Sequence, residues 1–74
     1  MLVYIFFVSS NMGQEDPIIF TSLKEARKAL KTRYKEDKSD YKGEIMDSEL
    51  YDDSAYIELF ENYIYYGIYD VKIN

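Results

Sequence analysis

The opening segment constrains the fold more than any other part of the chain. Leu2 to Val8 reads Leu-Val-Tyr-Ile-Phe-Phe-Val, seven apolar residues in succession. A strand that is wetted on one face alternates apolar with polar residues, whereas this run offers apolar side chains to both faces. We therefore expect a strand in the middle of a sheet. One helix can cover one face, so the opposite face must meet an irregular segment, a second copy of the chain or another protein.

The chain is long enough for one domain, which we place at residues 1–74. Its cysteine count is zero, so neither a disulfide nor a thiolate metal site adds stability. Hydrophobic residues make up 47% of the chain and aromatic residues 18%, which is too apolar for a disordered protein. The opening run falls far short of the roughly 20 residues that span a bilayer, and no Lys or Arg precedes it. We expect a folded, soluble, cytoplasmic protein without a membrane segment.

A helix is predicted to begin at Ser22. Ser22-Leu-Lys-Glu25 has the pattern of a capping box, in which the serine hydroxyl accepts from the Glu25 backbone N–H and the glutamate reaches back to the Ser22 N–H. Apolar residues then recur at the spacing of one helical stripe over 22–36, namely Leu23, Ala26, Ala29, Leu30 and Tyr34. The outward face is basic, with Lys24, Arg27, Lys28, Lys31 and Lys35. This face is typical of a solvated helix, with a phosphate contact as the alternative.

The other segments are predicted to be strands. Residues 18–20 follow a turn-forming stretch over 9–17 and form a short strand antiparallel to the first. Strands are also expected over 44–51, 55–60 and 63–73, the last two as a hairpin, because Tyr, Ile, Phe and Val are enriched there. The alternatives are a turn of helix within 44–51 and a short helix over 53–62. The expected fold is α+β, a small antiparallel sheet of four to five strands in ββαββ(β) order with one amphipathic helix on one face.

The alternation of the last strand separates its residues into two sets. Tyr65, Gly67, Tyr69, Val71 and Ile73 fall on one face, and the residues between them fall on the other. We expect Gly67 to mark a bulge or a close backbone approach.

Charge divides the chain into two parts. Residues 24–42 carry a net charge of +4 and residues 43–74 a net charge of −7, within a total of −5. Such asymmetry orients a protein toward a charged partner, and it also permits head-to-tail contact between copies.

The composition argues against catalysis and against a bound cofactor. The chain has no histidine and no cysteine, so the usual general base near neutral pH and the most easily activated nucleophile are absent. It also has no phosphate-binding glycine loop and no dinucleotide fingerprint. Asp47, Glu49, Asp52 and Asp53 lack the glycine turn and terminal glutamate of a calcium loop, so we expect no metal site.

Direct nucleic-acid binding is also disfavoured. Aromatic side chains that stack on bases normally lie among positive charges, whereas the tyrosines of residues 51–69 lie among negative ones. Core positions and protein interfaces are the better interpretation for these tyrosines.

The layout resembles that of small phage and mobile-element proteins, including anti-CRISPR and other anti-defence inhibitors. A short hydrophobic strand is followed by Phe-Thr-Ser-Leu-Lys-Glu-Ala-Arg-Lys-Ala-Leu at 20–30 and then by a tyrosine-rich acidic tail. The resemblance implies a non-catalytic inhibitor that blocks a host nuclease complex, in some cases by presenting carboxylates where DNA phosphates would lie.

Three functional hypotheses remain open. The first is a protein-binding inhibitor whose acidic, tyrosine-rich surface occupies a basic nucleic-acid-binding groove of a host defence nuclease complex. Its aromatic anchors would be Tyr51 and Tyr56, and its charge would come from Glu44, Asp47, Glu49, Asp52, Asp53, Glu58 and Glu61. The second is a self-associating structural or regulatory domain, a homodimer formed through the second sheet face. The third is a small-nucleotide-binding protein in which the basic helix face holds phosphates.

Overall fold

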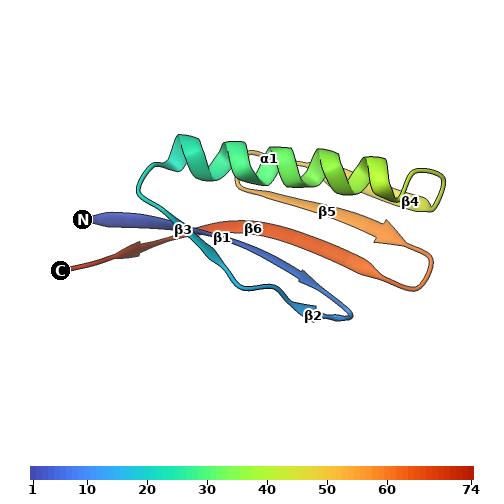
Figure 1. Ribbon diagram of the computed structural model, residues 1–74, viewed down its shortest axis with the longest axis horizontal. Coiled ribbons are helices and arrows are strands. Elements are labelled where there is room, and N and C mark those ends of the chain that lie inside the picture. Colours follow the sequence, from blue (N-terminus) through green and yellow to red (C-terminus); the bar gives the residue numbers. More distant parts are fainter.

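The opening hydrophobic run forms an interior strand, as predicted. In the computed structural model, which describes residues 1–74, this strand is β1 (Leu2–Ser10). It pairs antiparallel with β6 (Tyr63–Lys72) on one side and with β2 (Gly13–Gln14) and β3 (Ile18–Phe20) on the other. The hairpin partner of β6 is β5 (Ser54–Leu59), and β4 (Ile45–Leu50) forms the far edge. Figure 1 shows β1 and β6 as the long central pair.

The sheet has six strands, which corrects the prediction of four to five. The additional strand is β2, because β1 continues to Ser10 and the chain turns back at once instead of forming one long turn over 9–17. Gly13 has φ 125°, a conformation that side-chain-bearing residues rarely adopt, and this allows the tight reversal. The helix suggested as an alternative for 53–62 is wrong. β5 lies there, with Ala55, Ile57 and Leu59 alternating into the core.

The single helix, α1 (Leu23–Asp40), begins where the capping pattern predicts. The Ser22 hydroxyl accepts a hydrogen bond from the Glu25 backbone N–H at 3.3 Å, which satisfies one of the free donors of the first turn. The helix is one turn longer than the predicted end at residue 36. It stops at Tyr41, whose N–H donates to the Asp37 carbonyl, and Gly43 with φ 93° redirects the chain into β4.

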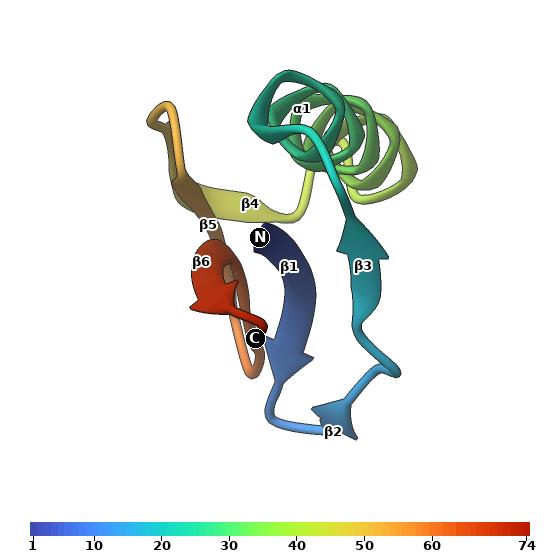
Figure 2. The same ribbon diagram turned by 90° about the vertical axis from the view of Figure 1, so that its left-hand side faces the viewer.

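The core lies between α1 and one face of the sheet. Ala26, Leu30 and Tyr34 form the buried helical stripe, as predicted. The sheet meets them with alternate residues of three strands: Phe6, Val8, Ala55, Ile57, Leu59, Ile64 and Tyr66. The end-on view in Figure 2 shows α1 over one face of a curved sheet. No second helix is present to cover the other face.

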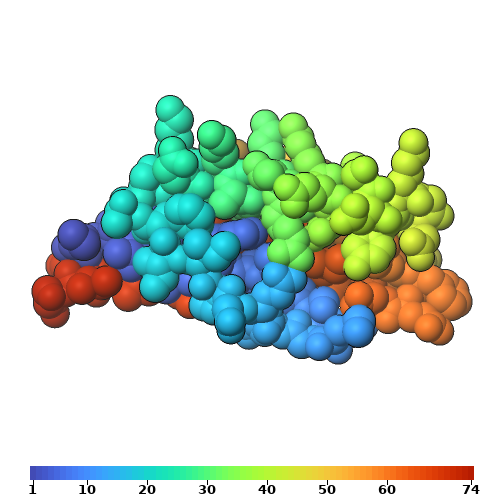
Figure 3. All heavy atoms as spheres, in the orientation of Figure 1, coloured from blue at the N-terminus to red at the C-terminus, as the bar shows by residue number.

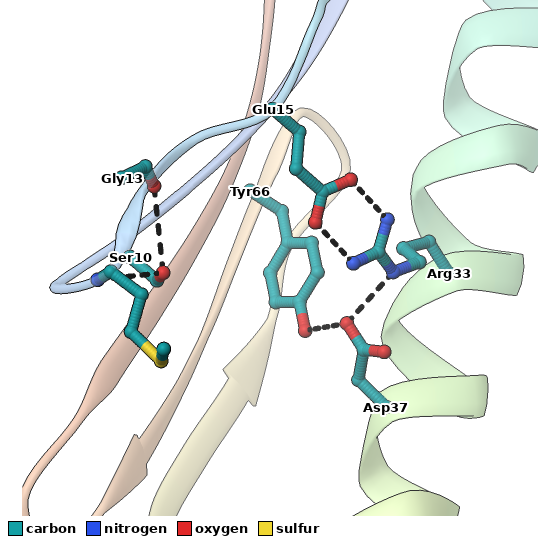
Figure 4. A network of polar contacts seen from close by, with 7 residues as sticks. Ser10, Gly13, Glu15, Arg33, Asp37 and Tyr66 are labelled. Atoms are coloured by element: carbon teal, nitrogen blue, oxygen red, sulfur yellow. Dashed lines mark hydrogen bonds and ion pairs between the residues drawn. The ribbon is translucent and has the colours of Figure 1, made fainter.

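A chain of polar contacts ties the helix to the sheet. The fully buried Tyr66 donates its hydroxyl proton to Asp37 Oδ2 at 2.6 Å, and Arg33 Nε donates to the same oxygen at 2.9 Å. Arg33 also forms a bidentate ion pair with the carboxylate of Glu15, which lies between β2 and β3 (Figure 4). Burial, and then the hydrogen bond to Asp37, raise the pKa of Tyr66 above its ordinary value. In Figure 3, side chains from the middle of α1 reach the light-blue segment around residue 15.

The molecule is elongated, with extents of 44 × 21 × 15 Å. Residues 1 and 73 lie side by side at one end, since the Ile73 N–H donates to the Met1 carbonyl at 2.7 Å (Figure 1). The one helix does not combine the length and the apolar composition needed to cross a membrane.

Candidate protein-binding surface

The sheet face turned away from α1 is the candidate functional surface, and we call it the open face. Directly paired residues of an antiparallel sheet point to the same side, and alternate residues point to opposite sides. Because Phe6 and Tyr66 face the helix, Phe7 and Tyr65 face away from it. The open face comprises Val3, Ile5, Phe7, Ser9, Gln14, Ile19, Asp47, Glu49, Ser54, Tyr56, Glu58, Tyr63, Tyr65, Gly67, Tyr69 and Val71.

The middle of the open face is apolar and accessible. Ile19 is 64% exposed and Tyr69 49% exposed, and Tyr63, Tyr65 and Val71 are each between 37% and 40% exposed. A monomeric protein rarely leaves a continuous apolar patch of large side chains in water unless the patch binds something. The exposed apolar surface of this face comes from β3 and β6, whereas of the opening run Val3 is buried and Ile5 and Phe7 are half-buried.

Three aromatic rings form an ordered row at the centre of the open face. The Phe7 ring lies across Gly67 and packs against Tyr65 and Tyr69, with ring centroids 5.9 and 5.8 Å apart. A Cβ on Gly67 would lie 2.5 Å from Phe7 Cζ, so only glycine leaves room for the ring in this position. Gly67 thus marks a close approach, one of the two roles predicted for it, and the register of β1 and β6 continues through it without a bulge.

A second aromatic pair leads from the row toward the β4 margin. Tyr56 and Tyr63 stack with centroids 5.6 Å apart and an interplanar angle of 13°. The Tyr56 hydroxyl donates to Asp47 Oδ2 at 2.9 Å, and this bond, with the negative charge behind it, raises the pKa of Tyr56 to about 12. The phenol therefore stays protonated and holds the carboxylate in place.

The margin of the open face is acidic. Asp47 and Glu49 project from β4, and Glu58 on β5 lies directly opposite Asp47. All three residues are exposed. None of the nine basic residues of the chain lies on this face. Eight of them lie in α1 or just after it, and Lys72 points, like Ile68, to the side of β6 opposite the open face. The open face therefore combines an aromatic centre with a negative, unneutralised border.

The other predicted acidic residues lie elsewhere, so the seven do not form one surface. Asp52 and Asp53 occupy the β4–β5 turn, where Asp53 forms an ion pair of 2.7 Å with Arg27 of the helix. Glu44 and Glu61 line a hollow beside the exposed Phe60, next to the β5–β6 turn. The two turns lie at opposite ends of β5.

Both predicted aromatic anchors lie on the open-face side of the sheet: Tyr56 is part of β5, and Tyr51, opposite Ser54, continues the alternation of Asp47 and Glu49 past the end of β4. Tyr51 follows β4, is 56% exposed and lines a shallow hollow with Arg27, Leu30, Lys31, Leu50 and Asp52. The sequence reasoning had grouped Tyr65 and Tyr69 correctly on one face but did not select them as site residues. Phe7 was missed because its place beside them depends on the pairing of β1 with β6.

A groove between β3 and α1 is the most apolar hollow of the molecule. Its volume is about 380 Å³, with Phe6, Ile18, Phe20 and Ala29 among its lining residues. Arg33 at its rim already contacts Glu15 and Asp37, so it is not free to hold a phosphate.

The structure contains no group of three or more side chains placed to hold a metal ion. No protein-family model, curated protein or solved structure matches the chain.

Proposed function

We propose that the protein is a non-catalytic binding protein whose open face docks onto a basic surface of another protein. The observation that carries this proposal is the composition of the open face, an exposed aromatic row bordered by three carboxylates with no basic residue among them. Aromatic side chains in the middle of a surface with charges at its rim are the usual composition of an energetically important protein contact.

The charge of the open face favours a protein partner over nucleic acid. Tyrosines that stack on bases need nearby cations to neutralise phosphates, and this face supplies only anions. The basic ridge of α1, formed by Lys24, Lys28, Lys31 and Lys35, lies on the other side of the molecule from the aromatic row.

A second copy of the chain is a weaker candidate for the partner, because its open face is also negatively charged. Pairing two open faces would bring the carboxylates of both copies into one interface with no cation to neutralise them, and such like-charge contacts cost affinity. A partner that supplies Lys or Arg at the border avoids this cost.

Inhibition by occupancy is the activity that such docking would have. Basic clefts are typical of proteins that bind nucleic acids, so a protein bound there competes with the nucleic acid for the same cations. This agrees with the anti-defence resemblance of the sequence, which implies a host nuclease complex as the target.

The experiment compares retention of a partner by immobilised wild type and by two variants. Tyr69→Ser removes an exposed ring from the row, and the control Phe60→Ser removes an 82% exposed ring outside the open face. We expect wild type and Phe60→Ser to retain the same basic protein from a host lysate. Tyr69→Ser should bind that protein, once purified, about 30-fold more weakly, the cost of one central aromatic contact.

Two further measurements test the mode of binding. Retention should fall steeply between about 0.1 and 1 M NaCl, because the contact depends on charges near the surface. Added nucleic acid should displace the protein from its partner. Equal retention by Tyr69→Ser and wild type, or retention that salt does not alter, would show that the open face is not the binding surface.

A further inference from the structure

The two margins of the sheet differ in length. On the β1 side the margin consists of β3 and β2, with three and two residues. On the other side β4 presents six residues and pairs with β5 alone. β4 is therefore the longest strand edge that remains open to a further strand.

The hydrogen bonds of the β4–β5 turn identify the residues that point outward. The Tyr51 N–H donates to the Ser54 carbonyl at 2.8 Å, so the backbone of Tyr51 points toward β5. Bonded and unbonded positions alternate along an antiparallel strand. Glu49 and Asp47 therefore bond to β5, whereas the backbone groups of Ser48 and Leu50 point away from it.

The side chains along this edge favour one kind of incoming strand. Asp47 and Glu49 project onto the open face, and the Asp47–Glu58 pair places two carboxylates directly opposite each other, which destabilises a sheet. A second copy of β4 would add further carboxylates beside them. A strand with Lys or Arg at alternate positions would neutralise them instead.

The helix side of the same edge offers space for an apolar side chain. A hollow of about 230 Å³ lies there, and its lining residues are Arg27, Leu30, Lys31, Leu50, Tyr51 and Asp52. Side chains between the basic positions of an added strand point to this side. The edge thus presents carboxylates on one side and, on the other, a hollow of mixed lining in which Leu30 and Leu50 can contact an apolar side chain.

We infer that β4 accepts an extended segment of the partner in which basic and apolar residues alternate, so that the partner adds a seventh strand to the sheet. The basic side chains lie beside Asp47 and Glu49, and an apolar side chain enters the hollow at Leu50. The backbone of the segment bonds to Ser48 and Leu50. This inference rests on the proposed function and specifies how a basic partner is held.

The test uses a fluorescent peptide of sequence Thr-Lys-Leu-Lys-Leu-Lys-Thr, blocked at both ends, and the isotope-labelled wild-type protein. We expect binding below about 1 mM, a range ordinary for a short peptide whose main affinity comes from main-chain bonds. In amide hydrogen exchange, the N–H groups of Ser48 and Leu50 should become protected when the peptide binds. Attraction by charge alone would leave both amides unprotected.

Variants of β4 provide a second measurement. Ser48→Pro removes the outward N–H and should weaken peptide binding at least about tenfold, whereas the control Ser48→Ala should not change it. Asp47→Asn with Glu49→Gln should weaken it about tenfold, and the matched pair Glu44→Gln with Glu61→Gln, which removes equal charge elsewhere, should have little effect.

The outcomes separate this inference from the proposed function. Absence of peptide binding at about 1 mM, or binding without protection of Ser48 and Leu50, overturns strand addition. The exchange measurement on wild type decides the question even if Ser48→Pro does not fold. If strand addition is overturned but retention of the partner still depends on Tyr69, the proposed docking through the open face stands.

Discussion

At the scale of single residues, Gly67 determines where the Phe7 ring lies. Because the glycine has no side chain, the ring extends over the neighbouring strand and packs between Tyr65 and Tyr69. The row is therefore ordered before any partner arrives, which lowers the entropy cost of binding.

Replacing Gly67 with alanine should disrupt the row. The new Cβ would meet Phe7 Cζ at 2.5 Å, so the ring must move out toward water. We expect Gly67→Ala to lower the free energy of unfolding by about 1 kcal/mol in urea denaturation and to change the near-ultraviolet circular dichroism of the tyrosines. Combining it with Phe7→Leu should remove most of this cost. An equal cost in both backgrounds would mean that the ring is not responsible.

At the scale of the elements, the strands were predictable because their patterns are local. Apolar runs and tyrosine-rich segments identified β1, β3, β4, β5 and β6 to within a few residues, and the Ser22 cap identified the start of α1. The end of α1 was not predictable, since its last turn contains only polar residues. One of them, Asp37, takes a place on the buried stripe because Tyr66 and Arg33 satisfy its carboxylate.

The candidate surface was predictable only in part. Alternation along one strand grouped Tyr65 and Tyr69, but the neighbours that complete the face come from strand pairing between distant parts of the chain. The acidic residues divided into separate groups because two turns direct the chain to opposite ends of β5. Net charge alone contains no information on this division.

The contact between Glu15 and Arg33 holds the β2–β3 segment against α1, and it should make stability depend on pH. The hydrogen bond from Arg33 lowers the pKa of Glu15 below its ordinary value. The unfolded chain therefore binds this proton more readily, so the stabilisation is present above the ordinary glutamate pKa and is lost as pH falls through the lowered one.

Glu15→Gln should remove this acid dependence. In urea denaturation the stability difference between wild type and Glu15→Gln should be largest near pH 6 and shrink between about pH 5 and 3. The control Glu36→Gln, which changes an exposed glutamate of α1, should follow the wild-type curve. A difference that stays constant with pH would assign the effect of Glu15→Gln to packing.

At the scale of the whole molecule, the distribution of charge separates the basic helix from the acidic open face. If the carboxylates keep two open faces apart, salt should promote self-association by screening them, since the apolar centre remains attractive. Sedimentation at about 0.1 M NaCl should show a monomer, with association increasing toward about 1 M.

The triple variant Asp47→Asn, Glu49→Gln and Glu58→Gln should associate already at the lower salt concentration. Association that salt reverses would instead indicate head-to-tail contact between the helix ridge of one copy and the open face of the next. Added salt should thus strengthen the association of two open faces and weaken the binding of a basic partner.

The pairing of β1 with β6 also governs when this protein can fold. The two strands at the centre of the sheet come from opposite ends of the 74 residues, so nearly the whole chain must loop back before they meet. Such distant pairings slow folding. During synthesis, β1 therefore leaves the ribosome tens of residues ahead of its main neighbour. Until β6 emerges and pairs with it, the exposed apolar surface of β1 is prone to aggregation unless a chaperone binds it or synthesis is fast.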